Sequence, residues 1–196
     1  MNANAAPARV PDHPVNPLFV DRWSPRSFSA ASMTEAELLT LLEAARWAPS
    51  ASNVQPWRFA YGLRGDDGFA RIAAGLLPNN RSWAEKAAAL VVVASKTTVE
   101  KDGAETLHKT HAFDAGAAWA HLALQAHLKG WIAHAMGGFD HAALRASLNV
   151  PENYALHAVV ALGRQGDKAE LPEGLQAREA PSGRNPLAAS ARHGSF

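Results

Sequence analysis

Apolar residues recur along the chain in patterns that predict alternating strands and helices. Four segments have the length and composition of strands, near residues 57–63, 88–95, 131–136 and 156–163. The second contains Val91-Val92-Val93, and consecutive apolar residues are typical of a strand that is buried on both faces. Helices are expected between the strands, so the pattern predicts an α/β sandwich with helices covering a mixed central sheet.

The first helix is expected over residues 34–48. Its apolar positions repeat at the spacing of one buried face: Leu38, Leu42 and Ala45. Ser32 and Glu35 have the spacing of a capping box at the helix start. Pro49 lacks an N–H group and disfavours helical geometry in the residue before it, so the helix should end there.

Shorter helices are expected at residues 71–77, where Pro78 would end the helix, and at residues 141–148. Residues 80–83 are expected to form a polar turn. Its last residue, Trp83, is expected in the hydrophobic core, with a place beside a bound substrate as the alternative.

A long helix is expected over residues 112–129, with Gly130 as its C-cap. It carries two apolar stripes. One consists of Phe113, Ala117, Ala120, Leu124 and Leu128, and the other of Ala118, Trp119, Leu122 and Ala126. A helix apolar on most of its circumference is usually buried, so one stripe is expected to meet a second subunit. His108 and His111 precede this helix, but a zinc site would need a third ligand that the sequence does not supply, so no metal is expected.

Composition narrows the possible functions. The 196 residues suit one domain, over residues 19–164, with an extended arm at residues 1–18. Residues 165–196 are expected to form an extension that is either disordered or wrapped over a partner subunit. Because the 19 basic residues are nearly balanced by 18 acidic residues, no nucleic-acid partner is expected. The absence of cysteine excludes disulfides and thiol nucleophiles. The proline-containing start has no apolar signal segment, so we expect a cytoplasmic protein without a membrane span.

The loop after the first helix is unusually rich in hydrogen-bonding side chains, with Ser50, Ser52, Asn53 and Gln55 within six residues. A turn would need only one or two such residues. The loop is either a plain helix-to-strand connection or a site where amide and hydroxyl groups converge on a planar polar ligand. We favour the second interpretation.

The segment Pro49-Ser50-Ala51-Ser52-Asn53-Val54-Gln55-Pro56-Trp57, following a helix that ends Glu43-Ala44-Ala45-Arg46, resembles the signature of the FMN-dependent nitroreductase family. An earlier segment, Arg22-Trp23-Ser24-Pro25-Arg26, resembles the family element that holds the FMN phosphate and ribityl chain. Two guanidinium groups and a hydroxyl suit phosphate oxygens. Trp23 replaces a residue that is often basic, so the resemblance implies only a backbone role there.

Two later segments extend the resemblance. Gly137-Gly138, at the end of the third strand, resembles the family element beside the flavin ring, where paired glycines let backbone N–H groups approach a flat ligand. Gly183-Arg184-Asn185-Pro186-Leu187 resembles the C-terminal motif whose arginine reaches the FMN phosphate. Arg184 is assigned that role, with Arg178 and Arg192 as alternatives.

The resemblance implies an intertwined homodimer with two FMN sites at its interface. Arg22–Arg26 and Gly137-Gly138 would come from one subunit and the Ser50–Gln55 loop from the other. It also implies an oxidoreductase in which NADH or NADPH reduces FMN and a small organic acceptor, such as a nitroaromatic, a quinone or an enal, reoxidises it. No side chain is assigned as catalytic acid or base. The alternative is a non-enzymatic dimer that binds a flavin or nucleotide in the same cleft.

Overall fold

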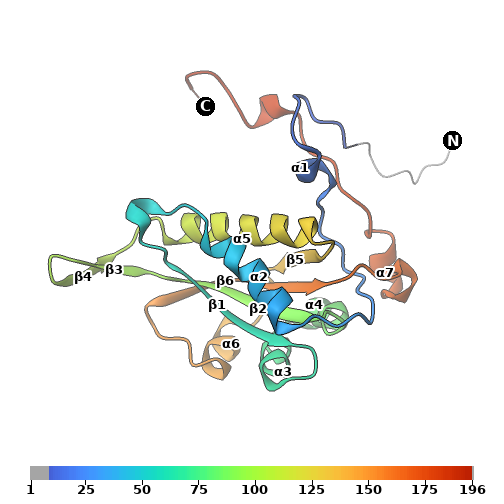
Figure 1. The fold of residues 1–196 in the computed structure, drawn as a ribbon, viewed down its shortest axis with the longest axis horizontal. Coiled ribbons are helices and arrows are strands. Elements are labelled where there is room, and N and C mark those ends of the chain that lie inside the picture. Colours follow the sequence, from blue (N-terminus) through green and yellow to red (C-terminus); the bar gives the residue numbers. More distant parts are fainter. Residues whose placement is uncertain (1–8, 196) are drawn as a thin grey trace.

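The computed structural model of the chain describes residues 9–195 (Figure 1). The arm expected at residues 1–18 is therefore described only from Arg9 onward. Residues 9–16 have no regular structure, and helix α1 (Pro17–Asp21) follows.

A four-stranded sheet forms the centre of the molecule. Its order is β1-β2-β6-β5, and every neighbouring pair of strands is antiparallel. The strands are β1 (Trp57–Leu63), β2 (Ala89–Lys96), β6 (Tyr154–Gly163) and β5 (Ile132–Met136). The four predicted strands are thus confirmed to within two residues, but the sheet of one chain is antiparallel rather than mixed.

Helices cover both faces of this sheet. Helices α2 (Glu35–Arg46) and α5 (His111–Leu128) pack on one face, and α3 (Asp67–Ala74), α4 (Pro78–Ala84) and α6 (His141–Ser147) pack on the other (Figure 1). Successive residues of β2 alternate between the two cores: Val91 and Val93 join the α2/α5 core, whereas Leu90 and Val92 join the α3/α6 core. Full burial of each such side chain contributes about 1.5–3 kcal/mol. The predicted sandwich, with β2 buried on both faces, is confirmed.

Helix α2 begins later than the predicted capping box. The box is formed by Thr34 and Glu37, in which the Glu37 N–H donates to Thr34 Oγ1 at 3.3 Å and the Thr34 N–H donates to Glu37 Oε2 at 2.9 Å. The prediction of Ser32 and Glu35 was wrong because Met33 is buried in the same core as Leu38, an arrangement typical of a hydrophobic staple that fixes the helix start between them.

The region around Pro78 also differs from expectation. Helix α3 spans Asp67–Ala74 rather than 71–77, because Asp66 caps it by accepting from the Phe69 N–H at 2.7 Å. Pro78 begins α4 instead of ending a helix, a position where its missing N–H costs nothing. The expected polar turn at residues 80–83 lies inside α4, and Trp83 is 2% exposed in the core, as expected.

A two-stranded hairpin precedes α5 and was not predicted. Its strands are β3 (Thr98–Lys101) and β4 (Ala104–Leu107). Asp102 and Gly103 connect them with φ values of 53° and 78°, as a type I′ turn requires. The hairpin projects from the body of the molecule beside the start of α5 (Figure 1).

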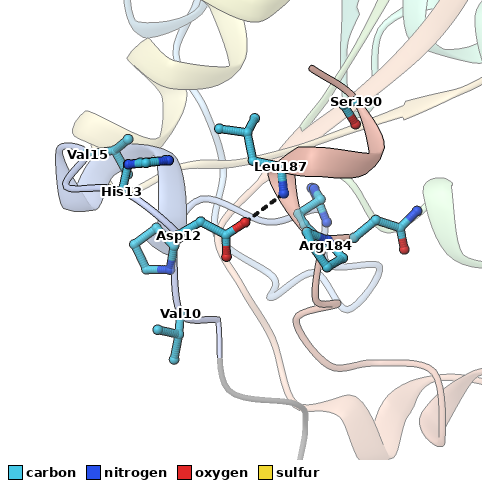
Figure 2. A pocket seen from close by; sticks show the side chains of 10 residues that line it. Val10, Asp12, His13, Val15, Arg184, Leu187 and Ser190 are labelled. Atoms are coloured by element: carbon cyan, nitrogen blue, oxygen red, sulfur yellow. Dashed lines mark hydrogen bonds between the residues drawn. The ribbon is translucent and has the colours of Figure 1, made fainter. Parts of the chain in front are cut away.

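The two ends of the described chain run together away from the sheet (Figure 1). The C-terminal segment contains only short elements: η2 (Lys168–Glu170), α7 (Glu173–Gln176) and η3 (Leu187–Ala189). Figure 2 shows the contact between the two ends, where the Leu187 N–H donates to an Asp12 carboxylate oxygen at 2.6 Å. Among residues 9–195, no helix combines the length and apolar character needed to cross a membrane.

Candidate functional site

Five arginines line one cavity of about 350 Å3. They come from three separate parts of the chain: Arg9, then Arg22 and Arg26, then Arg178 and Arg184. Trp23, Ser24, His134, Ala180 and Ser182 complete the lining. The structure therefore brings together the predicted residues Arg22, Trp23, Ser24, Arg26 and Arg184, together with Arg178, whereas Arg192 does not line this cavity.

We call residues 22–27 the arginine turn. The turn begins where α1 ends, because the Arg22 N–H still donates to Leu18 O at 3.3 Å while Arg22 itself is extended. Arg22 Nη1 lies 3.3 Å from Ser24 Oγ, to which it donates, and Arg9 Nη1 donates to Arg22 O at 3.1 Å. These contacts orient the side chains of the turn while using few of the guanidinium N–H donors.

The positive charge in this cavity is largely uncompensated. Of these five arginines, only Arg26 has a carboxylate of the described residues within 4 Å, Glu179 Oε2 at 3.9 Å. Burial, and then the charges of Arg9 and Arg184, lower the pKa of Arg22. A cluster of guanidinium groups that repel one another is stabilised by an anion, and phosphate oxygens match their donor geometry. The cavity has the chemistry of a phosphate site.

His134, on β5, also lines this cavity and was not identified from the sequence. Its Nδ1 donates to Pro25 O at 2.9 Å, because a carbonyl can only accept, and its ring lies 4.7 Å from that of Trp83. Burial is the main cause that lowers its pKa, and nearby Arg26 adds to the effect. A neutral imidazole with its proton on Nδ1 leaves Nε2 as a hydrogen-bond acceptor.

The loop after α2 has an uncommon backbone. Ser52, Asn53 and Gln55 have φ values of 50°, 54° and 52°, in the left-handed region that residues with a side chain rarely adopt. Such conformations cost roughly 1–3 kcal/mol each, and several of them close together are a feature found at binding and catalytic sites.

Hydrogen bonds hold this loop in place. Ser50 closes it, since Ser50 O accepts from the Asn53 N–H at 3.0 Å and Ser50 Oγ accepts from the Gln55 N–H at 2.9 Å. Asp114, in the first turn of α5, also holds the loop, because it accepts from the Ala51 N–H at 3.3 Å. The side chains of Ser52 and Asn53 make no hydrogen bond within the described part of the chain, and both residues are exposed.

The paired glycines after β5 differ in their surroundings. Gly138 is held by its carbonyl, which accepts from the Leu77 N–H at 3.2 Å and from Asn80 Nδ2 at 3.0 Å. A Cβ atom at this residue would lie 2.6 Å from Asn80 Nδ2, so a larger residue here would displace the Asn80 side chain. Gly137 is exposed, and its carbonyl accepts from the Phe139 N–H at 3.2 Å. No described atom beyond its chain neighbours lies within 4 Å of where a Cβ would lie, which leaves room for a ligand beside it.

One chain does not bring all the predicted site residues together. The Ala51–Asn53 turn (η1) lies beside the start of α5, whereas α1 and α7 lie toward the other end of that helix (Figure 1). Eighteen helical residues separate these ends by about 27 Å. The Ser50–Gln55 loop and the arginine cavity are therefore separate features of a single chain.

The histidines near α5 have other partners. His111 Nδ1 and His157 Nε2 lie 2.7 Å and 2.6 Å from Ser95 Oγ, whereas His108 Nε2 lies 3.6 Å from Asp114 Oδ2. Over the described residues, no three histidine or carboxylate side chains are grouped so that they could hold a metal ion.

Comparisons with known proteins agree with this architecture. The chain is 44% identical to a solved structure described as "the oxidoreductase containing FMN", with a TM-score of 0.94 over 100% of this chain and 98% of that one. A nitroreductase family protein from Streptococcus pneumoniae TIGR4 has the same fold, with a TM-score of 0.71 at 18% identity over 89% of this chain and 97% of the other.

A sequence relative from Rhodopseudomonas palustris (strain TIE-1), named "Putative NADH dehydrogenase/NAD(P)H nitroreductase", is 28% identical over 153 residues, which are 70% of this chain and 78% of the relative. The family model described as "Nitroreductase family" matches residues 20–164, most of the chain. The chain belongs to the nitroreductase family.

Proposed function

We propose that this protein is an FMN-dependent oxidoreductase that works as a homodimer. The observation that carries the proposal is the uncompensated arginine cavity, whose donors suit a flavin phosphate. The 44% identity to an FMN-containing oxidoreductase supports the same cofactor. We propose Arg22, Ser24, Arg26, Arg178 and Arg184 as the phosphate-binding residues.

The proposed flavin ring site combines elements of two subunits. The Ser50–Gln55 loop of one chain offers exposed Ser52 and Asn53 side chains, and Gly137 of the other leaves room for a ligand beside it. Their separation within a single chain supports this arrangement. So does the stripe of α5 that faces away from the core, in which Phe113 is 81% and Leu128 is 64% exposed. We propose that this stripe packs against the second subunit.

Bound FMN would accept a hydride from a nicotinamide and deliver reducing equivalents to an oxidised organic molecule. The name of the Rhodopseudomonas palustris relative mentions NAD(P)H, which supports NADH or NADPH as the donor. The protein's contribution is to hold the phosphate, to orient the ring and to keep one ring face accessible. We propose a nitroaromatic, a quinone or an enal as the acceptor.

The decisive experiment is an absorption spectrum of the purified protein. We expect two visible flavin bands that bleach when NADH or NADPH is added without oxygen and return when a quinone or nitroaromatic is added. A flavin that stays oxidised with either nucleotide would contradict the enzyme and favour a flavin-binding protein. A colourless protein that takes up no FMN would contradict the cofactor.

The double variant Arg22→Ala/Arg26→Ala tests the phosphate site within the same experiment. We expect it to fold and to contain little flavin, because both guanidinium groups of the arginine turn are lost. The matched control is Arg71→Ala/Lys168→Ala, which removes two exposed cations outside the cavity and should keep stoichiometric flavin. Full flavin occupancy in the Arg22/Arg26 variant would contradict the assignment.

A further inference from the structure

A buried carboxylate joins the C-terminal segment to the arginine turn. Glu179 is 7% exposed, and its Oε1 accepts from the Arg26 N–H at 2.7 Å, from the Ser27 N–H at 2.9 Å and from Ser27 Oγ at 3.0 Å. A carboxylate is rarely buried without such partners, because an unpaired buried charge is strongly destabilising. Two of these hydrogen bonds fix the backbone of the arginine turn at Arg26 and Ser27, and the third fixes the Ser27 side chain.

The second oxygen of Glu179 is used differently. Oε2 is buried and accepts no hydrogen bond from the part of the chain that the structure describes, and Arg26 Nη1 is 3.9 Å away, beyond hydrogen-bonding distance. The carboxylate thus attracts the Arg26 guanidinium without occupying its N–H donors. Arg26 remains beside the cavity with those donors free for another anion.

Because of its position in the chain, Glu179 also affects where other arginines of the cavity lie. It directly follows Arg178 and precedes Arg184 by five residues, and both arginines line the cavity that Arg22 and Arg26 also line. Ser27 strengthens the same junction, because Ser27 O accepts from the Gly166 N–H at 3.0 Å. One buried side chain therefore connects two groups of arginines that are about 150 residues apart in sequence.

We propose that Glu179 is a positioning residue for the phosphate group of the flavin. It holds the arginine turn and the C-terminal segment in one arrangement, so that cations from both meet the same phosphate. This inference rests on the proposed function. Its consequence is selectivity: Glu179 favours a flavin that carries a phosphate and has little effect on riboflavin, which lacks one.

The test measures how tightly the flavin-free protein binds FMN and riboflavin, from the quenching of flavin fluorescence. In Glu179→Ala we expect the Kd for FMN to rise about tenfold or more, because the hydrogen bonds that shape the turn are lost. The Kd for riboflavin should change less than about twofold. Glu179→Gln should recover most of the FMN affinity, because an amide oxygen can accept the same hydrogen bonds. Glu173→Ala, which removes an exposed acid of the same segment, is the matched control and should bind both flavins as the wild type does.

Three outcomes would overturn the proposal: unchanged FMN affinity in Glu179→Ala, an equal loss of FMN and riboflavin affinity, or a Gln variant as weak as the Ala variant. The second outcome would mean that Glu179 only stabilises the fold.

A limited trypsin digest separates failure of this inference from failure of the proposed function. If Glu179 holds the C-terminal segment, cleavage after Arg184, a site whose own sequence is unchanged, should be faster in Glu179→Ala than in the wild type. Inorganic phosphate should slow that cleavage in the wild type and not in the variant. Were the wild type to bind neither flavin, the proposed cofactor would be wrong, yet phosphate protection that depends on Glu179 would still support its role. Absence of that protection from the wild type would overturn it.

Discussion

At the residue scale, the proposed site gathers conformations and charges that folded chains usually avoid. Ser52, Asn53 and Gln55 are held in left-handed conformations. Of the five arginines around one cavity, only Arg26 has a carboxylate within 4 Å among residues 9–195. Both features lower the stability of the free protein, and a bound ligand offsets such costs. Their presence in the segments that resemble the family motifs supports a binding role for both.

His134 gives the first prediction at this scale. Its pKa in the folded protein lies below its ordinary value of about 6.5, mainly because the ring is buried. The unfolded chain therefore binds a proton first as the pH falls, so the stability from neutral His134 is fully present above about pH 6.5 and is lost as the pH falls to the folded pKa. We expect the free energy of unfolding of the flavin-free protein to be lower at about pH 5.5 than at about pH 7.5.

Urea denaturation of His134→Gln at both pH values tests this expectation. The pH-dependent part of the free energy of unfolding should shrink, although His157, whose pKa is also lowered by burial, should leave a residual dependence. His13→Gln changes an exposed histidine and should keep the wild-type dependence. An unchanged slope in His134→Gln would show that His134 titrates alike in the folded and unfolded states.

At the element scale, the first turn of α5 supports the strained loop. Asp114 is 3% exposed and accepts hydrogen bonds from the Ala51 N–H and from Thr110 Oγ1 at 3.1 Å. This role of Asp114 was not identified from the sequence, because its contact with Ala51 spans 63 residues. Contacts this distant in sequence do not appear in local periodicity.

The second prediction concerns this support. Asp114→Ala leaves the Ala51 N–H without its acceptor and leaves Thr110 Oγ1 with only His108 Nε2, 3.0 Å away, so the free energy of unfolding should fall by about 1–3 kcal/mol. Hydrogen exchange at the Ala51 amide should become faster, and FMN should bind more weakly, because the loop loses its fixed conformation. Asp67→Ala, at an exposed position in α3, is the control and should leave exchange at Ala51 unchanged. Wild-type exchange in Asp114→Ala would show that Ser50 alone maintains the loop.

The element boundaries show where local sequence was sufficient to predict the helices and strands. The strands and α5 lay close to their predicted ranges, because a buried element needs a long apolar pattern. The β3–β4 hairpin was missed although Asp102-Gly103 is a typical type I′ turn sequence, because its strands are short and largely exposed. The start of α2 depended on the burial of Met33, which a short capping pattern does not reveal.

At the scale of the whole molecule, packing within a single chain leaves part of the outer apolar stripe of α5 exposed. Ala118, Leu122 and Ala126 are buried against the sheet, but Phe113 and Leu128 are exposed. The exposed positions belong to one of the two stripes predicted from the sequence. We propose that this stripe packs against an antiparallel second copy, which would bring the Ser50–Gln55 loop at the start of one α5 toward the arginine cavity near the end of the other.

The third prediction tests that assembly. Phe113→Glu places a charge on the proposed interface, so the dimer should weaken roughly tenfold or more, because a buried unpaired charge is costly. Sedimentation velocity across a range of concentrations would measure the shift toward monomer, and bound flavin should decrease in parallel. Ala142→Glu, on the exposed surface of α6 across the sheet from α5, should remain as dimeric as the wild type. If Phe113→Glu is equally dimeric, α5 does not form the interface.

The sequence by itself determined the strands, the double-sided burial of β2, the long helix and the segments that resemble the nitroreductase motifs. These features depend on residues that are close in the chain, where periodicity and composition reflect the physical requirement directly. The roles of the motif residues remain predictions that the proposed experiments address.

Only the tertiary structure decided which distant residues meet. It placed Arg9 and His134 in the cavity with the arginine turn. It also joined Glu179 to that turn and brought Asp114 into contact with the Ser50–Gln55 loop. Each of these contacts depends on how the two chain ends and the helices pack on the sheet. Packing follows from the burial of the whole apolar surface at once, so no single stretch of sequence records it.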